Sequence, residues 1–263
     1  MSGASIRRTD LLALSNLRND GRKPHEIRRL RIQMGPVPES VGSAMVEMGL
    51  TTVLAVVTGP TECARRSDEQ TDRAILEVTL QVAPFAVADR RTFNANTDRR
   101  LIESALQIQR ALEAAVLLRT YPKTRICIDI SVLADDGGRL CAAVNAATLA
   151  LIDAGIPMKD FVCACSAGVG SANSSNVTVD LNRREETGGS VYLPAAILPQ
   201  RGTLVLAQCE ARLPDFETME HVLEAAMEGC RAVFEYMQAA VKDRAASTLA
   251  ARNGRANLST VFQ

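Results

Sequence analysis

Hydrophobic and polar positions alternate along several short stretches in the first half of the chain, and this pattern predicts strands. Apolar residues alternate with arginines over 27–33, and a β-branched apolar run covers 51–58. Glycines and a Gly-Pro pair separate these stretches, as in an antiparallel meander. The strands expected in this half are 27–33, 42–48, 51–58, 74–82 and 126–133, with a polar loop over 61–72.

The apolar period changes to 3.6 residues after Asp98. This period indicates a helix of about 20 residues, with Asp98 able to cap its start and Pro122 beyond its end. Residues 140–152 are rich in alanine and apolar on almost all sides, which is typical of a fully buried helix. Gly155 and Pro157 mark its end.

The second half repeats the layout of the first, with a strand meander followed by a long helix. Strands are expected at 161–167, 177–181, 189–198 and 203–209, and the helix from about 215 to 242. The sequence therefore predicts an α+β fold, an α/β sandwich of two pseudo-equivalent halves. The expected parts are an arm at 1–17, a domain at 18–244 with halves 18–155 and 156–244, and a tail at 245–263 that lacks the apolar period.

Charge and composition exclude several classes of protein. The 263 residues include 30 basic and 30 acidic side chains, so a globally basic nucleic-acid binder is excluded, but a locally basic channel is not. No apolar run approaches the roughly 20 residues that span a bilayer, and residues 1–10 do not look like a signal peptide. The seven cysteines lie mostly in apolar runs and are expected to be buried, reduced thiols. A cytosolic or nuclear protein is expected.

Two segments carry candidate site chemistry. Asp135-Asp-Gly-Gly-Arg139 joins a strand to an apolar helix, and a glycine-rich turn at a helix N-terminus can present N–H groups to an anion. A plain turn fits these residues as well. Asp180 to Glu186 places carboxylates after a strand, where they can bind a divalent cation, act as a general acid or lie in a solvated loop.

Arginines form the third candidate feature. Pairs occur in or beside loops, and eight basic side chains fall within 7–31. The guanidinium group suits bidentate contacts to phosphodiesters, although surface arginines balanced by nearby acids fit too. Residues 210–228 are acidic, so the neutral total conceals charge that is segregated along the chain. The pairs are Arg65 and Arg66, Arg90 and Arg91, and Arg99 and Arg100.

Short motifs over about 18–242 resemble the RNase PH family, and within it the RNA exosome ring subunit that corresponds to the catalytic subunit of the archaeal exosome. The most specific stretch, 144–168, holds Val144-Asn-Ala-Ala-Thr-Leu-Ala150, Asp153-Ala-Gly-Ile-Pro-Met158 and Cys163-Ala-Cys-Ser-Ala-Gly168. The other matching motifs are Arg18-Asn-Asp-Gly-Arg22, Gly42-Ser-Ala44, Gly59-Pro60, Asp72-Arg-Ala74, Ala83-Pro-Phe85, Arg99-Arg100 with Ile102-Glu103, Val132-Leu133 with Asp136-Gly-Gly138, and Asp180-Leu-Asn182.

The resemblance implies an RNase PH fold of duplicated β-α-β halves with mixed sheets and long helices. It implies a hexameric ring of RNase PH-type subunits under RNA-binding cap subunits, with single-stranded RNA threaded through a central pore and an associated exonuclease as a further partner. In active relatives the subunit degrades RNA from the 3′ end with inorganic phosphate as the nucleophile. Arg99 and Arg100 match the pair that contacts RNA phosphates, and Arg65 and Arg66 lie in the loop that lines the channel neck.

The phosphate site departs from the family pattern. The Gly-Thr-Arg or Gly-Ser-Arg motif of active relatives aligns with Gly138, Arg139 and Leu140, so an apolar side chain stands where the cationic clamp is needed. Gly137, Gly138, Arg139 and Leu140 are therefore expected to be the remnant of a phosphate site.

The acidic site departs as well. Asp180 matches the general acid or metal-linked aspartate of active relatives, but their second aspartate falls on Glu186. The additional methylene moves the carboxylate by about 1.5 Å, enough to impair catalytic geometry. Both residues are treated as vestigial, and neither a catalytic residue nor a bound metal or cofactor is expected.

The sequence thus favours a ring subunit that guides RNA, without phosphorolysis of its own, in the nucleus, nucleolus and cytoplasm. One alternative is an active phosphorolytic subunit that uses inorganic phosphate, or Mg²⁺, with Arg139 in place of the missing clamp. The other is a free-standing RNase PH-like homohexamer that trims tRNA ends.

Overall fold

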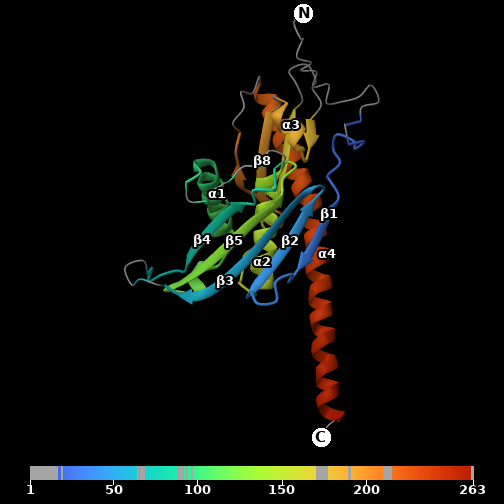
Figure 1. The fold of residues 1–263 in the computed structure, drawn as a ribbon. Helices are drawn as coiled ribbons and strands as arrows, with labels where there is room; N and C mark the ends of the chain where they lie inside the picture. Colours follow the sequence, from blue (N-terminus) through green and yellow to red (C-terminus); the bar gives the residue numbers. More distant parts are fainter. Residues whose placement is uncertain are drawn as a thin grey trace, which may run out of the picture.

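The computed structural model places strands in two sheets, with helices between and around them (Figure 1). It describes residues 17–18, 20–63, 65, 69–87, 90, 92, 94–95, 97–169, 177–188, 191–209 and 215–261, with side chains as far as residue 252. The expected arm at 1–17 lies outside the described residues except for Leu17.

The first half of the chain forms a five-stranded sheet in the order β1-β2-β3-β5-β4. Its strands are β1 (Leu30–Met34), β2 (Gly42–Met48), β3 (Thr51–Glu62), β4 (Ile75–Val82) and β5 (Thr124–Ala134). Neighbours are antiparallel except β4 and β5, which run parallel and are connected through α1 (Arg99–Ala115) and the short 3₁₀ turn Leu118–Thr120. All five predicted strands are confirmed, although β1 starts three residues later than expected and β3 runs four residues further.

The second half forms a four-stranded sheet in the order β7-β6-β8-β9. Its elements are β6 (Cys163–Val169), β7 (Val177–Val179), α3 (Arg183–Thr187), β8 (Val191–Leu198) and β9 (Thr203–Ala207). Both β7 and β8 run antiparallel to the β6 strand between them, so they are parallel to each other, with α3 connecting them. Each half therefore contains a β-α-β unit, and the predicted α+β class is confirmed. The first sheet is mixed, as the resemblance implies, and adjacent described strands of the second sheet are all antiparallel.

The central element is α2 (Arg139–Asp153), which contacts both sheets. Every residue from Cys141 to Leu151 is buried, as predicted for a helix that is apolar on all sides. Asn145, like Thr148, is a polar residue within this buried stretch. Its amide nitrogen donates to the carbonyl of Ala164 in β6 at 2.9 Å, and its oxygen accepts from the Ala164 amide at 2.8 Å. This pair joins the helix of the first half to the sheet of the second.

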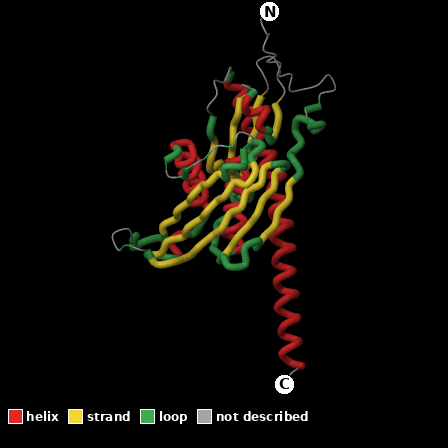
Figure 2. Tube along the Cα trace, viewed as in Figure 1, coloured by secondary structure: helices red, strands yellow, loops and turns green. Residues whose placement is uncertain are grey.

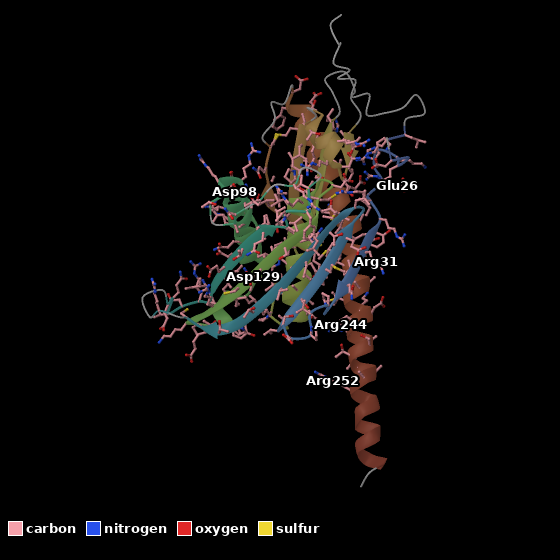
Figure 3. The ribbon with its side chains drawn as sticks, viewed as in Figure 1. Glu26, Arg31, Asp98, Asp129, Arg244 and Arg252 are labelled. Carbon is pink, nitrogen blue, oxygen red and sulfur yellow. The ribbon has the colours of Figure 1, made fainter. Side chains whose placement is uncertain are left out.

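Strand β5 shows how sequence alternation produces the core. Ile126, Ile128, Ile130 and Val132 are fully buried, whereas Asp129 between them is exposed on the outer face (Figure 3). Side chains alternate between the two faces of a strand, so one face packs on α2 and the other meets solvent or polar neighbours.

The C-terminal helix α4 (Phe216–Val261) is much longer than predicted. Its first part covers β6 and β8, the following turns pass along β1, and the end projects beyond both sheets (Figures 1 and 2). The described side chains from 242 to 252 are all exposed, and Arg252 lies on the projecting part (Figure 3). The expected helix end near 242 is wrong because alanines, leucines and arginines continue to favour helix after the apolar stripe has ended.

Two smaller features refine the helix predictions. Asp98 is the N-cap residue of α1 as expected, but its carboxylate accepts from the amide of Asn94 at 3.2 Å, and no side-chain cap bond to the helix forms. No helix within the described ranges is both long and apolar enough to cross a membrane.

Replacing Gly42 by alanine should strongly destabilise the fold, because Gly42 starts β2 directly against the end of α2. An added Cβ would lie 2.3 Å from the Ala154 nitrogen and 2.4 Å from the Ala150 oxygen, which are both backbone atoms. We expect Gly42→Ala to lower the free energy of unfolding by about 3 kcal/mol in urea denaturation. The control is Gly202→Ala, in open space with φ 65°, which should cost only about 1 kcal/mol. Equal losses at the two positions would contradict this account of the packing.

Candidate functional site

The glycine-rich turn between β5 and α2 lies at the centre of the site. Gly137 and Gly138 have φ of 89° and 68°, and Gly138 is the N-cap of α2. A Cβ on Gly137 would lie 2.5 Å from the amide nitrogen of Arg183 in α3, and one on Gly138 would lie 2.6 Å from a guanidinium nitrogen of Arg28. The turn therefore requires glycine because of both its backbone conformation and its tight packing.

The three backbone N–H groups of this turn all donate to side chains of the same chain. The amide of Asp136 donates to the hydroxyl of Thr51 at 3.0 Å, and that of Gly137 donates to the Asp135 carboxylate at 3.2 Å. The amide of Gly138 donates to the Glu186 carboxylate at 2.7 Å. An internal carboxylate thus occupies the N-terminus of α2, where the helix dipole favours negative charge.

Arg139 and Leu140 follow the turn in the first turn of α2. Asp135 holds Arg139 through its Oδ2 atom at 3.4 Å and holds Arg183 of α3 through the same oxygen, also at 3.4 Å. Leu140 is partly buried and packs against the core. The cation that precedes Leu140 in the sequence is therefore already paired with an acid.

These residues line a cavity of about 380 Å³. Its wall includes Asp135, Arg139, Leu140 and Glu186, and α1 adds Arg100 and Glu103. The structure therefore brings one predicted RNA-binding arginine to the phosphate-site remnant. Glu103 and Arg100 are exposed at its rim.

Asp180 does not face this cavity. It is 1% exposed, with φ 53°, and its carboxylate forms a bidentate pair with Arg28. Arg28 Nη2 lies 2.7 Å from Oδ1, Nε lies 2.9 Å from Oδ2, and the Arg28 amide donates to Oδ2 at 2.8 Å. Burial alone raises the pKa of Asp180, but the hydrogen bonds and charge of Arg28, with Arg22, outweigh burial and hold it below the usual value. Asp180 is thus a paired carboxylate rather than a proton donor.

The pKa of Glu186 is shifted in the opposite direction to that of Asp180, above its usual value. Burial raises its pKa, the charge of Asp135 adds to this shift, and the hydrogen bond from Gly138 opposes it. Tyr192 lies beside Glu186, and burial together with neighbouring negative charge raises the pKa of its phenol well above the usual value. A solvated loop was one interpretation of the segment holding Glu186, but residues 183–187 form α3, whose capping box joins Asn182 and Glu185.

Arginines near the N-terminus of the described chain complete the network, and sequence reasoning assigned them no partners. Arg18 is 3% exposed. It binds both oxygens of Glu185, the Val179 carbonyl at 2.6 Å and the Asp180 carbonyl at 2.9 Å. Arg28 also donates to the carbonyl of Gly137 at 3.1 Å. These arginines therefore tie the start of the chain to the second half and are not exposed phosphate contacts.

The other predicted RNA-binding arginines lie on two separate loops or loop ends. Arg99 is exposed at the start of α1 beside Arg100. Arg65 is exposed in the β3–β4 connection, and Arg66 lies outside the described residues. Thr51 starts β3 at the glycine-rich turn, so the twelve-residue length of β3, roughly 40 Å, separates that connection from the cavity. The structure does not bring Arg65 together with the pair on α1.

Within the described ranges, no group of three or more His, Cys, Asp or Glu side chains is placed to hold a metal ion. Among the cysteines, Cys141, Cys163, Cys165 and Cys230 are buried free thiols, and Cys63, Cys127 and Cys209 are partly buried. Burial raises the pKa of the Cys141, Cys165 and Cys230 thiols well above the usual value. These thiols therefore stay protonated.

Comparison with known proteins identifies the family. Residues 26–157 match the model of the RNase PH, or 3′ exoribonuclease, family, domain 1. The chain belongs to the RNase PH family. The human protein named exosome complex component RRP41 is 40% identical over 234 residues, which cover 89% of this chain and 94% of that protein. The Rrp41 protein of Thermococcus kodakarensis is 40% identical over 227 residues, covering 86% of this chain and 89% of that protein.

Solved structures share the RNase PH fold. Rice Rrp46 superposes with a TM-score of 0.74 at 24% identity, covering 85% of this chain and 100% of that chain. The Archaeoglobus fulgidus exosome with RNA bound to the active site gives a TM-score of 0.70 at 24% identity, covering 84% of this chain and 93% of that chain. At this identity the likeness supports the fold alone.

Proposed function

We propose that this chain is an RNase PH-type ring subunit of an RNA exosome, and that it supports 3′–5′ RNA processing and degradation by scaffolding the ring and lining its RNA channel. Support comes from relatives named exosome complex component RRP41, which match nearly the whole domain at about 40% identity. The subunit acts in the nucleus and nucleolus, where it serves rRNA processing, and in the cytoplasm.

The subunit contributes no phosphorolytic activity of its own. The observation that carries this proposal is Leu140 at the position of the clamp arginine, beside an Arg139 that is paired with Asp135. Phosphorolysis must hold a dianion next to an RNA phosphodiester, and an apolar side chain cannot balance that charge. The pairing of Asp180 with Arg28 points the same way, because a permanently paired carboxylate is a poor proton donor.

RNA contact is assigned to Arg99 and Arg100 near the cavity and to Arg65 and Arg66 near the channel neck. The exposure of the first three supports contact with phosphates, since paired and buried arginines could not reach a threaded strand. The partners are other RNase PH-type ring subunits, RNA-binding cap subunits, an associated exonuclease and single-stranded RNA.

The test of the scaffold role is native mass spectrometry of the chain expressed alone and with a second RNase PH-type subunit and cap subunits. We expect a monomer or small assembly alone and a hetero-oligomeric ring with the partners. A stable homohexamer of the chain alone would contradict the proposal and favour a free-standing RNase PH-like enzyme that trims tRNA ends.

A second candidate function is an active phosphate-dependent exoribonuclease subunit. One observation favours it: Arg139 lines the same cavity as Leu140 and is partly exposed. It would have to leave Asp135 to bind inorganic phosphate. Phosphate-dependent RNA degradation by the assembled ring distinguishes the two candidates.

A further inference from the structure

We propose that Glu186 excludes anions from this site by occupying the N-terminus of α2 with its own carboxylate. The inference rests on the proposed loss of phosphorolysis and deepens it. Leu140 leaves the site without the clamp cation, and the Glu186 carboxylate occupies the position of the anion that this cation would bind. An arginine at position 140 alone should therefore restore only weak phosphate binding.

The backbone N–H groups of the glycine-rich turn already have acceptors within the chain. An anion bound at a helix N-terminus needs N–H groups that point at it without another acceptor. Here the amides of residues 136, 137 and 138 donate to Thr51, Asp135 and Glu186, at 3.0, 3.2 and 2.7 Å. The shortest of these bonds goes to Glu186, from the N-cap residue itself.

Negative charge beside the turn also opposes the binding of an anion. A phosphate entering the cavity would meet the carboxylates of Asp135 and Glu186, while Arg139 in the cavity wall is paired with Asp135. Two like charges that compete for one set of donors repel each other strongly in a partly enclosed site. Glu186 must therefore leave before an anion binds.

The length of the Glu186 side chain lets its carboxylate reach the turn. Glu186 extends from α3, and the amide of Arg183 at the start of α3 donates to the carbonyl of Asp136 at 2.8 Å, which fixes α3 against the turn. From this fixed backbone the glutamate spans the gap to the Gly138 amide. An aspartate is one methylene shorter and would draw the carboxylate back by about 1.5 Å, which breaks a bond of normal length.

The experiment compares four full-length chains: wild type, Leu140→Arg, Leu140→Arg with Glu186→Ala, and Leu140→Arg with Glu103→Ala. The last is the matched control, because Glu103 adds a carboxylate to the same cavity from α1. Inorganic phosphate is titrated into ¹⁵N-glycine-labelled protein, and the resonances of Gly137 and Gly138 are followed by NMR. These resonances report phosphate binding at the turn. If the role of Glu186 were purely structural, its removal would leave the phosphate affinity unchanged.

We expect no saturable shift in wild type, weak binding by Leu140→Arg, and binding at least about tenfold tighter once Glu186 is also removed. The control should bind like Leu140→Arg. In the Leu140→Arg background, Glu186→Asp should recover part of the gain, and it is also the variant to use if the alanine change impairs folding.

Equal phosphate affinity of Leu140→Arg and its Glu186→Ala derivative would overturn the inference. So would an equal gain from Glu103→Ala, or no binding by any variant. These outcomes are separate from the proposed function, because phosphorolysis by the wild-type ring is measured independently. A ring that is inert, but whose Leu140→Arg subunit binds phosphate as tightly as the double variant, would refute the inference alone.

Discussion

Replacing Arg28 by methionine should lower the free energy of unfolding by about 3–5 kcal/mol, because the buried Asp180 carboxylate loses its guanidinium partner and keeps only the more distant Arg22, at 3.9 Å, as a cation. Methionine fills much of the same volume, so the loss reports the broken pair rather than a cavity. Asp180 is held by three bonds from this one residue, two from the guanidinium and one from the backbone amide. Urea denaturation followed by circular dichroism measures the effect.

The control for this change is Arg31→Met on the adjacent strand β1. Arg31 is 76% exposed at its side chain and lies 4.0 Å from Glu47, so its removal should cost less than about 1 kcal/mol. The pKa of Asp180 is lowered in the folded protein, so its stabilisation is complete above the ordinary aspartate pKa and is lost as the pH falls below it. The difference between wild type and Arg28→Met should therefore shrink in acid. A small, pH-independent loss would show that the pair is not the main support of this site.

Neutralising Arg99 and Arg100 together should weaken binding of single-stranded RNA to the assembled ring by roughly tenfold at 0.1 M salt. Both side chains are exposed at the start of α1, and Arg100 lines the cavity. Two lost phosphate contacts should also reduce the slope of log affinity against log salt by about 1.4. Fluorescence anisotropy with RNAs of two different sequences measures both quantities, and the loss should be the same for each.

Arg110→Ala provides the matched control for RNA binding, because this exposed arginine lies on the same helix about 15 Å further along. Its removal should leave the salt slope unchanged. If Arg99 and Arg100 instead support only subunit pairing, their replacement would lower ring assembly and leave the salt slope of assembled rings intact.

Local pattern was sufficient to predict most of the fold. In β5 every second residue is buried, and the sequence shows this as alternating isoleucines. In α2 all sides are buried, and the sequence shows this as a continuous apolar stretch. The pattern of buried residues did not predict the part of α4 beyond residue 242, because the side chains there are exposed and the helix is favoured by their intrinsic propensity. It also failed at α3, although the Asn182 and Glu185 spacing of a capping box is readable in the sequence.

The site was predicted less completely than the fold. The turn at Gly137 and Gly138 and the acidic segment were located, and the structure brings them together through the bond between Gly138 and Glu186. The pairing of Arg28 with Asp180 joins residues 152 positions apart, and that of Arg18 with Glu185 joins residues 167 apart. No local periodicity encodes such pairs, because they depend on how the two halves dock. Those arginines were consequently counted with candidate phosphate contacts rather than with the internal network.

The most direct measurement of the central claim is phosphate-dependent release of nucleoside diphosphates from a short poly(A) RNA by the reconstituted wild-type ring. We expect no release above that seen without phosphate, and no change with Arg139→Ala, because Leu140 cannot hold the anion and Arg139 is paired with Asp135. Robust release that requires phosphate and is lost with Arg139→Ala would contradict the account and establish an active phosphorolytic subunit.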